Sequence, residues 1–396
     1  MVLPGPSRHD PGGGPMRPVY VSAAAVVPFG KQPGRPAAEL GAAAAAELLR
    51  GAGLSPDAVE AGFVGAVYGG SLIAQRVLQR VGVSGPPVFS VENACASSGA
   101  AAHLAWQAIA AGVYDCVLVA GVENLTAFGS GALPLTSADI EVEQGQVMPA
   151  AYAMRAQRYL HETTATVADL TAVTVKNRGN GALNPRAHFR KEVTAAEVDA
   201  SRPVADPLQL MHCCPNTDGA AAVLLTSDGF ARELGTPRTR IRASVIRSGR
   251  FHTSFRDMTW PDITERSARA AYGMAGLGPA DLDLVELHDA FAIAELLHAE
   301  ALGLADRGTA HKAVAGGEFH RDGRVAVSPS GGLLSRGHPV GATGASQLAE
   351  CHWQLTGAAG ALQVPGAEVA LAHTTGGGIY GVDNGACSIH ILTAED

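Results

Sequence analysis

The sequence predicts an α/β protein made of two similar halves, with a mostly helical lobe inserted into the first half. Three observations support this prediction. Short apolar runs of strand length alternate with Ala-rich segments of helix length. A five-residue pattern recurs in both parts of the chain. Between residues 126 and 206, hydrophobic periodicity weakens while Pro, Asn, Arg and charged residues become more frequent.

The alternating pattern orders the elements along the chain. Small apolar residues gather in two helix-length segments, so we expect helices at 39–50 and 98–111. Strands are expected where short apolar runs stand between turn signals, which occurs at 17–25, 62–68, 116–120, 220–226, 240–246, 284–287 and 369–371.

An internal repeat indicates that the two halves arose by duplication. Ala52-Gly53-Leu54-Ser55-Pro56 and Ala275-Gly276-Leu277-Gly278-Pro279 each follow an Ala-rich helix and precede a predicted strand. Each half later has a Gly/Ser-rich turn that leads into a helix of small residues, at 94–101 and 337–345. A site between two such halves would take residues from both.

The repeat also fixes the predicted domain boundaries. We predict a first half at 16–125 plus 207–235, an inserted lobe at 126–206 and a second half at 236–396. Residues 1–15 are Gly/Pro-rich without an apolar core, so we expect a disordered extension and no signal peptide.

Composition excludes several classes of protein. Of the 396 residues, 47% are hydrophobic and 17% charged, which is enough apolar surface for folded cores and argues against disorder. The net charge of −8 and the lack of a basic block make nucleic acid an improbable partner. No uninterrupted run of 18 apolar residues occurs, so no membrane span is expected. Six cysteines without a Cys-x-x-Cys pair fit a reduced, cytoplasmic setting.

The sharpest candidate for chemistry is Cys95, in the segment Val91-Glu92-Asn93-Ala94-Cys95-Ala96-Ser97-Ser98-Gly99. The pattern places the thiol between a short strand and the first turn of a helix. Unpaired N–H groups and the helix dipole there favour an anion. We therefore predict a lowered thiol pKa and room for an anionic intermediate beside it. A buried structural cysteine is the alternative.

His338 is the second candidate, and it lies between Gly337 and Pro339 in a tight turn just before a helix. Such a turn holds the imidazole rigidly, and a rigid histidine near a cysteine is the usual means of activating a thiol at neutral pH. A capping or packing histidine is the alternative.

Two more histidines follow predicted strands of the second half. His288 ends the strand at 284–287, at the sheet edge where α/β folds place ligands, and could orient a water or donate to an oxyanion. Alternatively, His288-Asp289 caps the following helix. His373 precedes Gly376-Gly377-Gly378, whose glycines let backbone amides approach a ligand, and is a candidate acid or base.

His212-Cys213-Cys214 has the composition of a metal site. Adjacent cysteines cannot easily share one tetrahedral zinc ion, so we interpret these residues as pocket wall and expect no metal.

Together these segments resemble the thiolase superfamily, especially its sterol-carrier-protein-type branch and the archaeal acetoacetyl-CoA thiolases. The likeness runs over essentially everything after residue 16. It rests on segments that occur in the right order and at the right spacings: Gln75-Arg76 through Val91-Glu92-Asn93-Ala94-Cys95-Ala96-Ser97, residues 207–222 ending in Thr217-Asp218-Gly219-Ala220-Ala221, His288-Asp289-Ala290-Phe291, and Gly337-His338-Pro339.

The resemblance implies a five-layered αβαβα fold and an acyl-CoA C-acyltransferase that works through an acyl-enzyme on Cys95. His338 would activate Cys95, and His288 would help to form an oxyanion hole. The backbone amide of Cys95 and the segment near Gly377 would form a second oxyanion hole. Cys214 falls where many thiolases place a serine beside the pantetheine arm. Coenzyme A thioesters would be substrates, and no resident cofactor is implied.

The sequence departs from the family at the second cysteine, which serves as acid or base for the substrate carbon. By the resemblance, its position near the C-terminus holds His373, and the sterol-carrier-type alternative position holds Ala290. Either His373 transfers the proton, or the acceptor carbon is already nucleophilic, as in an activated phenol ring. General acid–base help is worth roughly 10²–10⁴-fold, so its loss would redirect the chemistry.

Two other functions are considered. One is a retro-aldolase lyase that acts on a CoA ester, and the presence of Cys95 argues against it. The other is a non-catalytic subunit that binds acyl-CoA or a partner, which is disfavoured by the joint presence of Cys95, His288 and His338. The resemblance also implies a homodimer or tetramer and a possible small zinc-ribbon/OB-fold partner protein.

Overall fold

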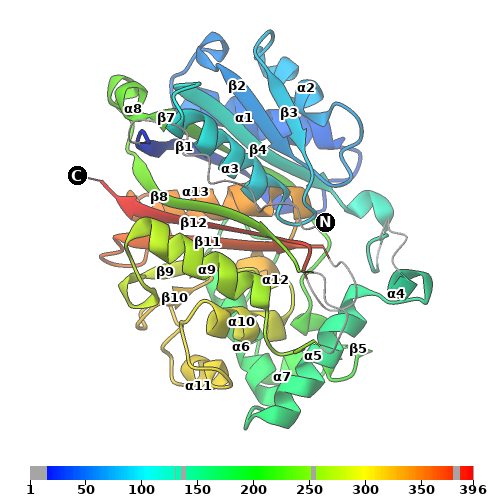
Figure 1. The fold of residues 1–396 in the computed structure, drawn as a ribbon. Helices are drawn as coiled ribbons and strands as arrows, with labels where there is room; N and C mark the ends of the chain where they lie inside the picture. Colours follow the sequence, from blue (N-terminus) through cyan, green and yellow to red (C-terminus); the bar gives the residue numbers. More distant parts are fainter. Residues whose placement is uncertain (1–15, 130, 135–139, 251–255, 378–383, 396) are drawn as a thin grey trace, which may run out of the picture.

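The computed structural model describes residues 16–129, 131–134, 140–250, 256–377 and 384–395. The predicted extension at 1–15 therefore lies outside the described residues. In the described part of the chain, the main sheet has ten strands in the order β10-β9-β11-β12-β8-β1-β7-β4-β2-β3. This confirms the predicted α/β class (Figure 1).

The sheet consists of two five-stranded halves with the same internal order. The first contains β1 (Val19–Gly30), β2 (Ala61–Gly65), β3 (Val88–Val91), β4 (Cys116–Asn124) and β7 (Asp218–Ser227). The second contains β8 (Thr239–Ser248), β9 (Leu284–Glu286), β10 (Ala326–Val327), β11 (Val369–Gly376) and β12 (Ala386–Ala394). Within the sheet, the two halves are joined by two residue pairs between β1 and β8. The matched order is what duplication predicts.

Helices cover the strands in layers. Those of the two halves are α1 (Ala37–Gly51), α2 (Ile73–Leu78), α3 (Ser97–Ala110), α8 (Asp228–Leu234), α9 (Asp262–Ala275), α10 (Ala292–Ala301), α11 (Ala310–Ala315), α12 (Gly332–Arg336) and α13 (Thr343–Leu355). The segment between β4 and β7 contains α4 (Ile140–Glu143), α5 (Met148–Glu162), α6 (Val167–Ala182), α7 (Ala195–Asp199) and the short strands β5 (Pro203–Ala205) and β6 (Leu208–Gln209).

Three hydrophobic cores separate these layers. Alternate residues of β4 face opposite sides of the sheet, so Leu118 packs in a core with α1 while Val119 packs in a core with α3 and α13. The third core lies beneath α9 and α10 on the outer face of the second half. The order helix, strand, helix, strand, helix confirms the five-layered fold, with α3 and α13 in the central layer (Figure 1).

The repeated five-residue pattern ends one helix in each half, α1 in the first and α9 in the second. After α1, Gly53 adopts a φ of 63°, and the Leu54 N–H donates to the Leu49 carbonyl at 2.9 Å. After α9, Gly276 adopts a φ of 69°, and the Leu277 N–H donates to Tyr272 at 3.2 Å. Glycine takes this left-handed conformation without steric cost, so it ends both helices before the next strand.

Residues without side chains bring the two halves into direct contact. A Cβ at Gly121 of β4 would lie 2.4 Å from the Gly341 carbonyl oxygen, and one at Gly344 would lie 2.5 Å from the Gly99 nitrogen. The Ala345 N–H at the start of α13 donates to Ser98 Oγ at 2.9 Å. The N-terminal ends of α3 and α13 therefore meet at the junction of the halves.

Helix α6 ties the inserted segment to the second half through buried polar contacts. Lys176 Nζ lies 3.2 Å from Glu295 and donates to the Val327 carbonyl at 2.8 Å. Asn177 Nδ2 donates to Asp289 at 2.7 Å.

Among the described residues, no helix is both long and apolar enough to span a membrane.

Replacing Gly121 with Ala tests the contact between the halves. The added methyl group cannot fit against the Gly341 backbone, so we expect a loss of about 1–3 kcal/mol in the free energy of unfolding, measured by urea titration. Gly273→Ala is the matched control, because nothing lies near its exposed helical position. That control should be neutral or gain up to about 1 kcal/mol. Equal effects of the two changes would contradict the proposed close approach.

Candidate active site

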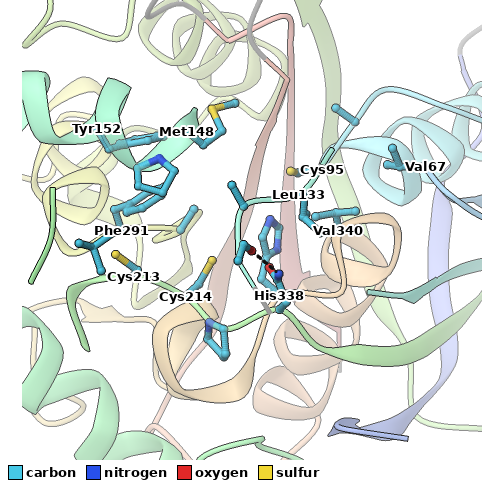
Figure 2. Close-up of a pocket in the computed structure, with 18 of the residues that line it drawn as sticks. Val67, Cys95, Leu133, Met148, Tyr152, Cys213, Cys214, Phe291, His338 and Val340 are labelled. Carbon is cyan, nitrogen blue, oxygen red and sulfur yellow. Dashed lines mark hydrogen bonds between the residues drawn. The ribbon is translucent and has the colours of Figure 1, made fainter. Parts of the chain in front are cut away.

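A cavity of about 750 Å³ opens where the two halves and the inserted segment meet. Its lining includes five of the six predicted site residues, namely Cys95, Cys214, His288, His338 and Gly377. Figure 2 shows Cys95 and His338 on one side of the pocket and Tyr152, Phe291 and Cys213 on the other. The structure thus brings together groups that lie far apart in the sequence.

Cys95 lies in a tight turn between β3 and α3. Ala94 adopts a φ of 49°, a left-handed conformation that is strained for alanine. Two hydrogen bonds hold this turn: Ser97 Oγ donates to the Ala94 carbonyl at 2.5 Å, and the Asn93 N–H donates to Ser97 Oγ at 3.0 Å. The strained turn presents the thiol at the start of α3, as the sequence pattern predicts.

Two backbone N–H groups approach the Cys95 sulfur, from Gly377 and from Cys95 itself. The end of β11 reaches this position because Gly376 has no side chain; a Cβ there would lie 2.5 Å from the Asn93 carbonyl oxygen. Convergent N–H donors of this kind can stabilise an oxyanion. The placement is the one that the resemblance implies for Gly377.

His338 and His288 complete the reactive group. A donor atom from each histidine and the Cys95 sulfur all lie within 4.8 Å of one another. The two imidazole rings meet edge to face with their centroids 5.0 Å apart. His338 Nδ1 hydrogen-bonds to Thr343 Oγ1 at 2.7 Å, which fixes the ring and leaves Nε2 for the pocket. His338 is thus placed at the pocket beside Cys95, and its catalytic role stays a prediction.

The predicted lowering of the Cys95 pKa is wrong for the resting site. Partial burial of the sulfur raises the pKa of Cys95 to about 12 by desolvation, although the Gly377 N–H opposes this shift. Burial, with smaller contributions from His288 and Arg336, lowers the pKa of His338 well below its usual value. The resting pair is therefore a neutral thiol and a neutral imidazole.

The loop that carries His288 is held by its neighbour Asp289. That carboxylate accepts from the Leu333 N–H at 2.7 Å, at the start of α12, and from Asn177. Helix α10 begins at Ala292, so the alternative in which Asp289 caps the following helix is wrong; Asp289 instead binds the N-terminus of α12. The fully buried carboxylate fixes where His288 can point.

His373 is the predicted site residue that the structure does not bring to the pocket lining. It is fully buried behind His288, whose backbone N–H approaches His373 Nδ1 at 3.4 Å. His373 Nε2 pairs with Thr264 Oγ1 at 3.2 Å, and the same hydroxyl pairs with His298 Nδ1 at 3.1 Å. With both nitrogens engaged, His373 supports the His288 backbone and does not face a substrate.

Glu123 is a positioning residue that the sequence analysis missed. Its buried carboxylate accepts from the Val67 and Tyr68 N–H groups, both at 2.9 Å, and from the Gly341 N–H at 3.1 Å. It thereby joins pocket-lining residues of the first half to the turn that carries His338. Burial raises the pKa of Glu123 to about 7.

The far wall of the pocket is aromatic and sulfur-rich. The Tyr152 and Phe291 rings stack with centroids 4.3 Å apart. Cys213 and Cys214 lie beside them (Figure 2), as predicted for wall residues. The Cys214 N–H donates to the Ala290 carbonyl at 2.9 Å. This bond joins the backbone of Cys214 to that of Ala290 at the pocket wall.

The cluster of Cys95, His288 and His338 is also the one group among the described residues whose donor atoms could together hold a metal ion. A thiolate and two imidazoles suit zinc. A pocket-facing thiol beside an imidazole also suits nucleophilic catalysis, and the backbone donors around the sulfur favour this second use.

The resting ionisation of Cys95 can be tested by alkylation with iodoacetamide. Because its pKa is raised, thiolate should be scarce at neutral pH, and the rate should climb about tenfold per pH unit between pH 7 and 10. Peptide mass spectrometry would assign the modification to Cys95. A rate that is already constant above pH 6 would contradict this prediction and indicate a thiolate–imidazolium pair.

Comparison with known proteins identifies the family. Residues 19–229 match the model "Thiolase, N-terminal domain" and residues 246–382 match "Thiolase C-terminal domain-like". The chain is 44% identical to the benzoylsuccinyl-CoA thiolase subunit BbsB of Thauera aromatica, covering 86% of this chain and 90% of the relative. It is 40% identical to an acetyl-CoA acetyltransferase of Methanothermobacter thermautotrophicus, covering 87% and 91%.

Solved structures agree with these relatives. The Ltp2-ChsH2(DUF35) aldolase superposes with a TM-score of 0.84 at 26% identity, covering 96% of this chain and 98% of that one. Human mitochondrial 3-ketoacyl-CoA thiolase shares the fold with a TM-score of 0.74 at 19% identity, covering 97% and 100%. With both family models matched and the Cys–His–His cluster assembled between its halves, the chain belongs to the thiolase family.

Proposed function

We propose that this protein is an acyl-CoA C-acyltransferase that forms or cleaves a carbon–carbon bond through an acyl thioester on Cys95. One observation carries the proposal: the Cys95 sulfur and one nitrogen each of His288 and His338 lie within 4.8 Å of one another at the wall of a cavity. A nucleophile next to a base with a fixed orientation is the arrangement that covalent acyl transfer requires.

The first half-reaction loads the enzyme. As the Cys95 sulfur attacks the thioester carbonyl, its proton passes to His338 Nε2, which is the free nitrogen of that ring. The carbonyl oxygen gains negative charge and accepts from the N–H groups of Cys95 and Gly377. The carbon–sulfur bond to coenzyme A then breaks, and the departing sulfur takes the proton back from His338.

The second half-reaction transfers the acyl group to carbon. Burial raises the pKa of the Cys214 thiol well above its usual value, which favours its neutral form, so we assign the proton transfer to His338. Neutral His338 takes the proton from the acceptor carbon and returns it to the Cys95 sulfur when the new carbon–carbon bond releases it. His288 donates to the acceptor's carbonyl oxygen. Because burial also makes His338 a weak base, the site favours an acceptor carbon that is already activated.

Acylation by an aromatic CoA ester tests this assignment. Incubation with benzoyl-CoA should add one benzoyl group, located on Cys95 by peptide mass spectrometry, and Cys95→Ala should abolish it. His338→Ala should slow acylation by roughly 10²–10⁴-fold because the thiol loses its base. The control is His320→Ala, which removes an exposed histidine outside the pocket and should leave the rate unchanged.

The alternatives give different outcomes. Cleavage of a CoA ester that survives in the Cys95→Ala variant would favour a retro-aldolase, a possibility kept open by the similar aldolase complex. Absence of labelling with every acyl-CoA, together with retained acyl-CoA binding, would favour a non-catalytic subunit.

We further propose that the acyl donor is aromatic. The stacked Tyr152 and Phe291 rings, with Met148 beside Tyr152, form an apolar wall to the pocket (Figure 2). Aromatic rings bind in such surroundings through burial and offset stacking. The benzoyl group in the name of the Thauera relative's substrate is consistent with this assignment.

Tyr152→Ala should separate aromatic from small donors. Loss of one stacked ring should slow acylation by benzoyl-CoA about two- to tenfold relative to acetyl-CoA, because an aromatic pair contributes roughly 0.5–1.5 kcal/mol. The ratio of the two acylation rates is the measurement. An unchanged ratio would show that the acyl group binds elsewhere in the cavity.

The assembly and setting of the protein are also proposals. Strand β3 is an edge of the sheet next to the nucleophile turn, and its Phe89 side chain is 47% exposed. We propose that this edge forms the homodimer interface, and that two dimers could assemble into a tetramer. A small zinc-ribbon/OB-fold protein is the proposed partner, and the cytoplasm is the proposed location. A native mass of one subunit for the purified chain would contradict the dimer.

A further inference from the structure

Three pocket-lining side chains have a buried polar atom without a hydrogen-bond partner in the described part of the chain: His288 Nδ1, Thr375 Oγ1 and Asn384 Nδ2. The proposed reaction already uses His288. It gives no role to the other two. Burying a hydroxyl or an amide without a partner is costly, so such groups in a pocket wall indicate that a ligand supplies the missing bond.

Thr375 lies close to the reacting atoms. It is 1% exposed and immediately precedes Gly376, whose Cα packs against the backbone of the Cys95 turn. Gly377, two residues further on, directs its N–H at the Cys95 sulfur. The neighbouring Thr374 hydroxyl already donates to Gln347 at 2.5 Å. Of the two threonines, only Thr375 has a hydroxyl left for a substrate.

Asn384 lies two residues before β12, which begins at Ala386. Its residue is 6% exposed, and the backbone beside it is fixed by two hydrogen bonds: the Gly385 N–H donates to the Gly376 carbonyl at 2.9 Å, and the Gly249 N–H donates to the Gly385 carbonyl at 3.0 Å. The side-chain amide is therefore held at the pocket wall, where Nδ2 can only donate.

We infer that Thr375 and Asn384 are specificity residues for a carbonyl or carboxylate oxygen that the substrate carries in addition to the carbonyl groups that react. The amide nitrogen can only donate and the threonine hydroxyl can donate, so each is satisfied by an oxygen with free lone pairs. An apolar substrate of the same shape would leave both groups unpaired. This inference rests on the proposed acyl-CoA function and names the substrate class that the pocket selects.

The test compares three CoA esters of matched length and shape on the Cys95→Ala variant, which binds without turnover. Succinyl-CoA carries a terminal carboxylate, 4-oxopentanoyl-CoA a ketone, and 4-methylpentanoyl-CoA only methyl groups. We expect the apolar ester to bind at least about tenfold more weakly than one or both oxygenated esters, by calorimetry. A carboxylate requirement would appear as tight binding of succinyl-CoA alone. Equal affinities for all three esters would overturn the inference.

Variants then assign the effect to the two side chains. In the Cys95→Ala background, Thr375→Val and Asn384→Leu should each lower the ratio of affinities for oxygenated and apolar esters several-fold. Thr375→Ser retains the hydroxyl and should leave this ratio unchanged. Thr374→Val is the matched control: its hydroxyl is satisfied by Gln347, so the preference should persist even if stability falls. Preferences that are unchanged in both test variants would overturn the assignment.

The acyl-labelling experiment keeps the two claims separate. If Cys95 takes an acyl group but the three esters bind equally well, the inferred specificity is wrong and the acyltransferase stands. If the esters are distinguished as expected but Cys95 is never acylated, the inferred specificity stands and the proposed reaction falls.

Discussion

The active site depends on the close approach of two backbones at the centre of the molecule. Gly121 in the first half leaves room for the Gly341 carbonyl of the second, and Gly344 at the start of α13 packs on Gly99 of α3. Larger residues at these positions would separate the helices and the turns that precede them. The abundance of Gly and Ala in this chain is thus a requirement of the junction where a thiol and an imidazole from opposite halves must meet.

The same close packing sets the electrostatics of the site. Burial raises the pKa of the Cys95 thiol and lowers the pKa of both imidazoles, so desolvation outweighs the favourable helix start and the neighbouring N–H groups. In the proposed reaction, charge develops as the substrate is attacked, beside backbone donors that are already oriented. Donors in such a partly desolvated site stabilise an oxyanion more strongly than they would in water.

The fold and the residues that meet at the pocket could be predicted from the sequence because those features have local signals. The helix stop around Gly53 and Gly276 needs only a glycine in the right place, and apolar runs marked the strands. Cys95 and His338 could be found because each sits in a distinctive turn before a helix. These signals depend on neighbours in the chain, so they survive without knowledge of the tertiary structure.

The features that could not be predicted from the sequence depend on contacts between residues that lie far apart in the chain. The pKa of Cys95 was predicted in the wrong direction because burial by the opposite half is invisible in a local pattern. His373 was assigned to the reaction because it follows a predicted strand. In the structure its ring lies behind His288, and its Nε2 pairs with the Thr264 hydroxyl. Thr375 and Glu123 were missed because ordinary residues in regular strands gain a role only from the segments that fold against them.

The internal duplication has a further consequence for the chemistry. Two identical subunits related by a two-fold axis present the same side chain at equivalent points, so such a pair would offer either two sulfurs or two rings. Here the turn before α3 carries Cys95 and the corresponding turn before α13 carries His338. Fusion into one polypeptide removed the constraint of symmetry and allowed each copy to specialise as one member of an unlike pair.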